Sequence, residues 1–459
     1  MGVSLEALPR LASLGALTRD DVEALSRALE EPTFMRDRRL AALVAFEKMD
    51  WPGFGEEEWR FSEVDGEAIG GIAAAGQSSD AERSSGADRP TAVAHAVHGK
   101  SGSFFGGGPG EDLIVSTDRR TALAQLTPAA ANSGVVLMSL ARAARELPET
   151  VERHLPAQSF ADRFEALRAA LWSAGVFLLV PEGAEVAAPL GALEVLSVPG
   201  ASFTQNIVVA SRGSRVTFLQ GHVSEGLGEA ALHLSSTHAV AEEDAALDLV
   251  SLQEWTGPVT HFGKLQAVVG SRARVRTTVI TMGGEKVRFS PEAVLSGPGG
   301  QYAASGLYFA DAGQHFEYRT KIEHLAAHTR SDLLYKGALQ GKGARSVFVG
   351  DVRVAKGAVG TDAFQANRNL ILTEGARADS IPFLEIEAAD VRCSHAAATG
   401  TVDDEHLFYL MARGIPKEQA KRLVVFGFFA DVLARVELEG LRERLTASIE
   451  EELARGGER

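Results

Sequence analysis

The pattern of apolar and polar residues changes near Gly175. Beyond it, short β-branched or alternating runs recur roughly every ten residues, and helical periodicity is nearly absent for roughly two hundred residues. Glycines and other turn-forming residues separate the runs. The expected strands are Val176–Val180, Thr204–Ala210, Arg215–Leu219, Ala230–Leu234, Lys264–Val269, Arg274–Met282, Gly306–Ala310, Leu333–Leu339, Ser346–Val352, Asn369–Leu372 and Phe383–Glu387.

Two all-β architectures fit this pattern, a sandwich and a right-handed parallel β-helix. The strands outnumber those of a single sandwich, and no Asn-Gly or Asp-Gly hairpin signal separates successive strands. Repeated strand–turn units that cannot bury themselves alone favour a solenoid. We therefore predict a mainly β protein with a right-handed parallel β-helix core over 176–400, whose ends are capped by helical domains.

The region before the strands, 1–175, predicts a mostly helical N-terminal domain. Its segment near 73–110 is rich in Ala, Gly, Ser and charge without periodicity, which predicts a flexible loop. Trp59 and Phe61 are expected to be core aromatics. The expected helices begin at Thr18, which is a capping residue, and then cover Arg36–Met49, Gly134–Arg145 and Phe160–Trp172.

The last region, 401–459, predicts a helical C-terminal domain. Helices are expected over His406–Arg413, from Pro416 onward, and over Leu438–Leu453. The helix after Pro416 has an apolar face wider than one core needs. Such a face indicates either a docking surface or packing on the chain's own helices, and both alternatives stay open.

Composition limits the partners. The 459 residues include 61 acidic and 46 basic side chains, a net charge of −15, which disfavours binding to nucleic acid. A single cysteine excludes an internal disulfide framework and suits a reducing compartment. We expect a cytoplasmic protein, because Met1–Asp20 lacks a signal-peptide pattern and no apolar run approaches the ~20 residues that span a bilayer.

The candidate chemistry lies in the stretch from Ile381 to Thr399, which holds Cys393 and His395. Residues two apart in a strand share a face, so a thiolate and an imidazole would lie side by side. This pairing suits zinc or iron–sulfur ligation. The alternative is that Cys393 is a small buried apolar side chain. Two ligands cannot close a metal site, so further ligands would come from elsewhere.

Other motifs give weaker signals. Gly99-Lys100-Ser101 lacks the upstream glycine of a phosphate-binding loop, since that position is Ala94, and Gly343 follows Gly341-Lys342 where Ser or Thr is required.

Histidines and amides outside these motifs favour structural roles. His324 and His328 resemble a helical metal-binding pair, but their surroundings are strand-like, and His233 and His238 lack a matched acid for a catalytic triad. A set of polar residues predicts a ladder in or along the solenoid: Asp362, Gln365, Asn367 and Asn369.

The C-terminal motifs carry a family resemblance. Pro382-x-Leu-Glu-Ile386, Asp390-Val-x-Cys-Ser-His395, Leu407-Phe-Tyr-Leu410 and Arg413-Gly-Ile415 follow one another in the order seen in SufD. The chain thus resembles the SufD subunits of the SufBCD iron–sulfur cluster assembly scaffold. It departs from the family in having Ala396, where Gly commonly follows the histidine.

This resemblance implies a β-helix core between helical ends and a scaffold rather than an enzyme. It implies pairing with SufB, with a transient cluster shared at the interface near His395 and Cys393, and no tightly bound cofactor. One cysteine favours SufD over the cysteine-richer SufB. A homodimer is expected as a possible state of the isolated chain. In the family the terminal helices bind the SufC ATPase, for which the candidate contacts are Leu407, Phe408, Phe426, Phe428, Phe429 and Val432.

The alternative is a β-helix enzyme acting on carbohydrate or acyl substrates. It would need a cleft with paired carboxylates, or a catalytic histidine beside a cofactor groove. The six-residue repeat of acyltransferases is not visible.

Overall fold

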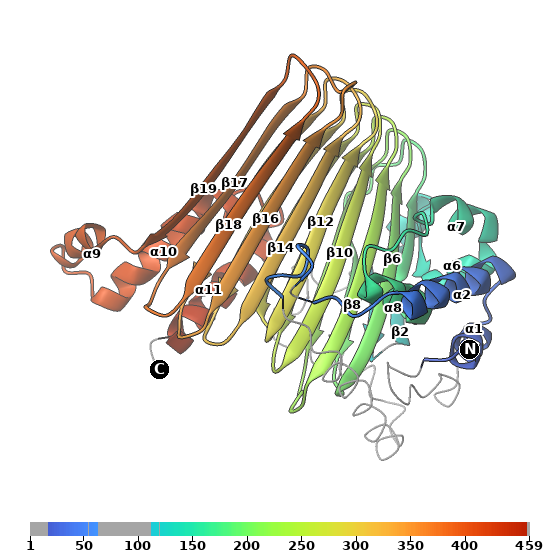
Figure 1. The fold of residues 1–459 in the computed structure, drawn as a ribbon, viewed down its shortest axis with the longest axis horizontal. Coiled ribbons are helices and arrows are strands. Elements are labelled where there is room, and N and C mark those ends of the chain that lie inside the picture. Colours follow the sequence, from blue (N-terminus) through green and yellow to red (C-terminus); the bar gives the residue numbers. More distant parts are fainter. Residues whose placement is uncertain (1–16, 54, 63–111, 119, 457–459) are drawn as a thin grey trace.

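The computed structural model describes residues 17–53, 55–62, 112–118 and 120–456. Two long sheets face each other and are wound from one continuous chain, with helices along their outer faces (Figure 1). The expected loop near 73–110 and the Gly99-Lys100-Ser101 motif lie outside the described residues. No helix within the described ranges is long and apolar enough to cross a membrane.

Successive strands of the solenoid alternate between the two sheets. Sheet A has ten strands in the order β19-β17-β15-β13-β11-β9-β7-β5-β1-β2, and sheet B has nine in the order β18-β16-β14-β12-β10-β8-β6-β4-β3. The strands of sheet A are β1 (Asp112–Thr117), β2 (Arg120–Gln125), β5 (Leu190–Leu196), β7 (Arg215–Ser224), β9 (Ala246–Trp255), β11 (Arg274–Gly283), β13 (Gln301–Ala310), β15 (Arg330–Leu339), β17 (Asp362–Ile371) and β19 (Arg392–Thr401). Those of sheet B are β3 (Val136–Ser139), β4 (Val176–Val180), β6 (Gly200–Ala210), β8 (Ala231–Ala241), β10 (Val259–Val269), β12 (Lys286–Leu295), β14 (His315–His324), β16 (Arg345–Val354) and β18 (Arg377–Ile386).

Each coil repeats the previous one in parallel register. Arg330 pairs with Asp362, and Asp362 with Arg392, so one coil takes roughly thirty residues, within the range of known solenoid repeats. Side chains alternate inward and outward along each strand. Inward-facing apolar residues such as Val279, Tyr308 and Phe348 form the continuous interior between the sheets. The predicted parallel β-helix is confirmed.

Equivalent turns of successive coils stack on one another along one edge of the solenoid. Asp244, Arg272, His328 and Asp390 occupy corresponding turns with φ of 60°, 55°, 57° and 57°, in the left-handed region. The His328 amide donates to the Val359 carbonyl of the next turn (2.8 Å), so the turns form a ladder. The neighbouring turn has Gly360 at this position, where a Cβ would clash with the His328 ring. His328 is therefore a turn residue.

Helices cover the outer faces of both sheets. Before the main run of strands they are α1 (Arg19–Ala28), α2 (Thr33–Lys48), α5 (Pro128–Asn132), α6 (Leu140–Glu146), α7 (Pro148–His154) and α8 (Arg163–Leu171). After it they are α9 (Asp404–Met411), α10 (Lys417–Leu433) and α11 (Glu439–Gly456). Thr18 caps α1 through a capping box with Asp21, as a helix beginning at Thr18 requires.

The position of these helices corrects one expectation. The N-terminal helices and the buried Trp59 share a core with outward-facing residues of sheet B, such as Phe203 and Phe262. Helices α10 and α11 bury Phe429 and Leu445 against the outer face of sheet A. The expectation that helices cap the ends of the solenoid is wrong for the C-terminal end, because α10 and α11 lie along the side of sheet A (Figure 1).

Local expectations met different outcomes. The strand expectations coincide with strands in β4, β6, β7, β8, β10, β11, β13 and β15 to β18, and the strand-like surroundings expected around His324 overlap β14. Strands β5, β9 and β12 were not anticipated. The expected helix Gly134–Arg145 is wrong in its first half, which is strand β3 pairing antiparallel with β4. Strands β1 to β3 thus extend both sheets upstream of residue 176.

A buried ion pair ties the N-terminal helices together. Arg39 on α2 contacts Glu31 at 2.6 Å, with side-chain exposures of 1% and 0%. The same guanidinium donates to the carbonyls of Ala170 (2.9 Å) and Trp172 (2.8 Å), which links α2 to the end of α8. Removing one member of such a pair leaves an uncompensated charge in the interior.

We therefore expect Arg39→Met to lower the free energy of unfolding of the helical region by about 3–5 kcal/mol. Chemical denaturation followed by Trp fluorescence measures the change. Arg36→Met is the matched control, because its pair with Asp37 has side-chain exposures of 46% and 60%, and about 1 kcal/mol or less is expected. Equal effects of both substitutions would contradict the assigned role of the buried pair.

Candidate functional site

The C-terminal end of the solenoid exposes two strand edges. Within the described chain, β18 pairs only with β16, and β19 only with β17. Natural edge strands usually carry charges, prolines or bulges that prevent pairing with other chains. β18 has Pro382. In β19, the residues from Cys393 to Thr401 include no proline and no Asp, Glu, Lys or Arg. The β19 edge is therefore suited to adding a strand from another chain.

Cys393 and His395 lie on this last strand. They pair in register with Ala363 and Gln365, both buried residues of β17, and are two residues apart. No further coil covers them among the described residues, so His395 is exposed, while Cys393 is half-buried against the interior core. Burial raises the pKa of the Cys393 thiol, and the Asp362 carboxylate adds to the rise. A metal ion binding here would have to displace the thiol proton.

The ATPase-contact candidates on the terminal helices separate into two groups. Phe408 on α9 is 74% exposed, and Leu407, Phe426 and Phe428 are half-buried. Phe429 and Val432 are buried against sheet A and do not reach the surface. Further exposed apolar side chains accompany Phe408 that were not among the candidate ATPase contacts. We call the following set the α9–α10 apolar surface: Phe408, Tyr409, Met411 and Leu423.

Helix α10 buries side chains along its length, Ala420 and Val425 as well as Phe429, and polar contacts anchor its second half further. The Lys336 ammonium donates to the Phe428 carbonyl and forms an ion pair with Asp431, both at 2.6 Å. Together with Phe429 and Val432, these contacts hold the second half of α10 on the solenoid. Helix α9 has no buried residue. The α9–α10 apolar surface is therefore carried on a stably held base.

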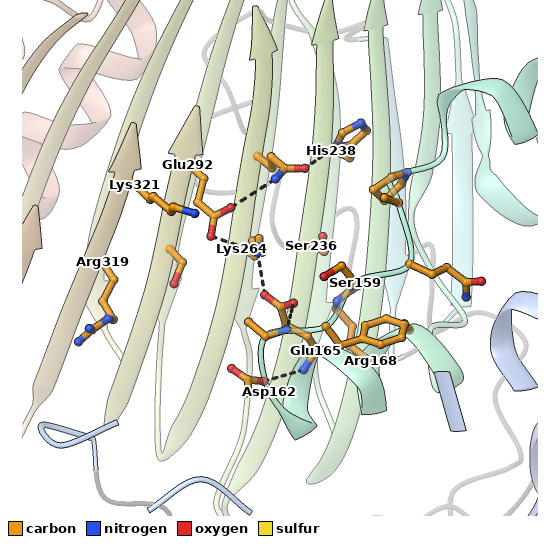
Figure 2. A pocket seen from close by; sticks show the side chains of 18 of the residues that line it. Ser159, Asp162, Glu165, Arg168, Ser236, His238, Lys264, Glu292, Arg319 and Lys321 are labelled. Carbon is orange, nitrogen blue, oxygen red and sulfur yellow. Dashed lines mark hydrogen bonds and ion pairs between the residues drawn. The ribbon is translucent and has the colours of Figure 1, made fainter. Parts of the chain in front are cut away.

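A polar cleft of about 540 Å³ lies on the outer face of sheet B beside α8 (Figure 2). At its centre the Lys264 ammonium contacts Glu165 (2.8 Å) and Glu292 (3.0 Å). Burial acts to raise the pKa of Glu165, but the Lys264 charge and hydrogen bond lower it overall. For Glu292 burial prevails, and its pKa is raised. Burial and the nearby Glu165 charge raise the pKa of Asp162, which caps α8.

This cleft fits a structural joint better than a hydrolytic site. Both glutamates share one ammonium, and Glu165 also accepts the Ala161 amide at 3.0 Å. Neither carboxylate is free to act as nucleophile or general acid while Lys264 holds it. The contacts connect α8 with β10 and β12, so their evident effect is to hold the helix on the sheet.

The expected polar ladder lies largely inside the solenoid. Gln365, Asn367 and Asn369 are buried, whereas Asp362 is exposed at the start of β17. The Tyr308 hydroxyl donates to Asn369 (2.6 Å) and accepts from Asn367 (3.0 Å). The structural role expected for the three amides is thus supported by their hydrogen bonds.

His324 is likewise a structural residue. Its Nδ1 lies 2.8 Å from the Thr329 hydroxyl and its Nε2 lies 2.9 Å from the Ser331 hydroxyl. Both ring nitrogens are occupied, and His328 sits in a turn, so the two do not form a metal-binding pair. Burial lowers the pKa of His324 to about 4.

Three other histidines lie together inside the solenoid: His222, His233 and His261. Sequence reasoning missed this group because it compared His233 with His238, which faces the outer cleft. The pattern that could have revealed the group is the pairing of strands, because His233 lies directly opposite His261 on the neighbouring strand of sheet B.

These features define a β-solenoid protein with an open strand edge and helices along both sides. The family model described as the SufBD core domain of the SUF system for FeS cluster assembly matches residues 195–428. The chain is 30% identical over 344 residues to the iron–sulfur cluster assembly protein SufD of Bacillus subtilis, covering 74% of this chain and 78% of that protein.

Two further relatives extend the comparison. An iron–sulfur cluster assembly SufBD family protein of Mycobacterium tuberculosis is 44% identical over 252 residues, which cover 51% of this chain and 64% of that protein. One of Staphylococcus epidermidis is 25% identical over 438 residues, covering 92% and 90%. The match therefore spans less than two thirds of the mycobacterial protein's length and 90% of the staphylococcal protein's. It belongs to the SufBD family of iron–sulfur cluster assembly proteins.

The buried His324 generates a prediction about acid stability. An unfolded histidine has a pKa of about 6.5, whereas that of folded His324 is about 4. Between these values the unfolded chain binds the proton and the folded chain does not, so stability falls as pH falls through this window. His324→Gln should make the decline between pH 6.5 and 4 shallower by roughly 3 kcal/mol. Denaturant titrations at several pH values measure this, and an unchanged decline would exclude a neutral buried His324.

Proposed function

We propose that this chain is a SufD-type scaffold subunit and not itself an enzyme. In this proposal it pairs with a SufB-type subunit through the open end of the solenoid, and a nascent iron–sulfur cluster forms at that interface as cargo. A SufC-type ATPase binds the C-terminal helices. The observation that carries the proposal is the uncovered β19 strand with His395 exposed on it.

The chemistry of the last coil supports a shared site. One imidazole and one thiol cannot complete the four-ligand set of a cluster or of a tetrahedral metal ion. A chain with a single cysteine therefore depends on a partner for the remaining ligands. Strand addition at β19 would bring a partner's side chains beside His395, because paired strands lie about 4.8 Å apart. A homodimer through the same edge would pair identical edges and bring together two thiols.

The terminal helices support a second contact. Four large apolar side chains on α9 and the first half of α10 are between 43% and 74% exposed. An exposed apolar cluster of this kind is typical of a docking surface. It lies apart from Cys393 and His395, so both partners can bind at once. In the proposal, motion driven by ATP hydrolysis reaches the solenoid through the anchored half of α10.

His395→Ala tests the cluster interface. The full chain is co-purified with SufB-type and SufC-type partners, the cluster is reconstituted, and iron and sulfide per complex are measured. We expect the variant to lose about tenfold or more of the loading, because an exposed ligand is removed without a change in packing. His406→Ala is the control, since that side chain is 74% exposed on α9 and lies outside β19. Full loading of the His395 variant would contradict the proposed interface.

The ATPase contact is tested by Phe408→Ser. Loss of a central aromatic anchor typically costs 2 kcal/mol or more, so we expect about 30-fold weaker binding of the ATPase. Isothermal titration or surface plasmon resonance with the purified ATPase measures the change. Val44→Ser is the matched control, because Val44 is 47% exposed but lies on α2. If both variants bind equally well, the α9–α10 apolar surface is not the ATPase contact.

A further inference from the structure

The interior of the solenoid contains three histidine rings that face one another across the two sheets. His222 comes from β7 of sheet A, and His233 and His261 come from the neighbouring strands β8 and β10 of sheet B. The ring centroids are 5.2, 5.1 and 4.8 Å apart for the pairs His222–His233, His222–His261 and His233–His261. One nitrogen from each ring lies within 4.8 Å of the other two. All three side chains are fully buried.

Two of these rings have no hydrogen-bond partner. Both nitrogens of His222 and both of His233 are enclosed and unbonded. His261 contacts neutral groups through both ring nitrogens. Its Nδ1 lies 2.9 Å from Gln253 Oε1 and 3.4 Å from Trp255 Nε1. Its Nε2 lies 2.8 Å from the Ser235 hydroxyl, so a metal ion bound at Nε2 would replace that hydrogen bond. Buried polar groups normally find partners, so four unpaired ring nitrogens around one point require an explanation.

A neighbouring part of the interior shows the contrast. Asn206 donates to Thr237 (3.3 Å), Thr237 donates to Gln220 (2.5 Å) and Gln220 donates to Ser251 (3.0 Å). These residues lie on the same strands as the histidines or on adjacent ones, and they satisfy one another. Other interior atoms are also unbonded, among them the hydroxyls of Ser202, Thr204 and Tyr335. The histidine group differs from these because two wholly unbonded rings face a third ring within one cluster.

The surroundings of the group suit a cation. Burial lowers the pKa of His222 to about 3 and those of His233 and His261 well below the usual value, so all three are neutral, which is the form that binds metal. Glu194 pairs in register with His222 on the adjacent strand. It is 4% exposed and alternates with Leu190, Ala192 and Leu196 of the interior, so it faces inward too.

We propose that His222, His233 and His261 bind one divalent transition-metal ion of the zinc class inside the solenoid. Imidazole nitrogens suit Zn²⁺, Co²⁺, Ni²⁺ and Fe²⁺. Zinc–nitrogen distances of about 2.0–2.1 Å in a tetrahedral site correspond to nitrogens about 3.3 Å apart, so modest side-chain rotations close the group. Burial raises the pKa of Glu194 to about 8, so this side chain would add a negative charge beside the ion only by releasing its proton. Gln253 holds His261 as an outer partner. The ion joins sheet A to sheet B.

This site does not depend on SufB-type or SufC-type partners, because every ligand belongs to this chain. It is also separate from Cys393 and His395, which lie on the last coil. The test uses the untagged full chain, expressed in medium supplemented with zinc or, separately, with cobalt. Since the rings are fully enclosed, metal is expected to enter during folding and to resist removal by a weak chelator.

Metal content after weak chelation is measured by mass spectrometry. We expect one zinc or cobalt ion per chain, and the cobalt form should show the visible absorption of a four-coordinate nitrogen and oxygen site. His222→Ala and His233→Gln should each retain at least about tenfold less metal. His238→Ala is the matched control, because this histidine lies on β8 but faces the outer cleft. The double variant Cys393→Ser/His395→Ala should also keep its metal.

A second measurement covers variants that fold poorly. Extraction of metal from the wild-type chain by a strong chelator should lower its thermal midpoint, and re-addition of zinc should restore it. The same treatment should leave the midpoint of His233→Gln unchanged. A wild-type chain that contains no metal after expression with either ion overturns the proposal. Full metal content in both His222→Ala and His233→Gln overturns it equally.

Discussion

The organisation of this molecule depends on register between successive coils. Each inward-facing side chain packs on its counterpart one coil away, as Ala363 does on Ser331 before it and Cys393 after it. Burying an aliphatic or aromatic side chain in such a row contributes about 1.5–3 kcal/mol. A coil can gain this only from its neighbours, so the interior is stable while the terminal coil is covered on one side alone. The open edges of β18 and β19 therefore arise because the last coil has no following coil to pack against.

The helices reinforce this asymmetry because they use the sides of the solenoid. Arg39 ties the N-terminal helices to one another, and Lys264 fixes α8 against sheet B. Lys336 and Phe429 fix α10 against sheet A. Among the features that these contacts leave exposed are the β18 and β19 edges and the α9–α10 apolar surface. These features are short in sequence and lie within the last coil and the helices that follow it. The molecule thus separates its surfaces for self-packing from those open to other chains.

The interior handles polar side chains in two ways. Around Tyr308 the hydroxyl and the amides of Asn367 and Asn369 satisfy one another, so polarity there fixes the geometry of the coil without any ligand. Around His222 the rings converge but leave their nitrogens unpaired. The same buried environment that makes an unpaired nitrogen costly also keeps these imidazoles neutral. Leaving these buried nitrogens unpaired destabilises the fold, and the same nitrogens are able to bind a cation.

The sequence by itself determined the mainly β solenoid with helices on either side, because strand periodicity, turn residues and capping signals such as Thr18 are local properties. It also marked Cys393 and His395, since two residues on one strand share a face whatever the fold. Strand β12 escaped detection because its outward positions carry charges, including Arg288, that are buried only once the N-terminal segment covers them.

Tertiary structure alone decided which chemistry-bearing residues meet. His222, His233 and His261 lie on three different strands, β7, β8 and β10, and converge only because the coils close at a particular register. It also decided that Phe429 faces sheet A while Phe408 stays exposed, a choice that the apolar pattern of the terminal helices leaves open. The physical reason is the same in each case: burial depends on what lies opposite a residue, and that partner is distant in the sequence.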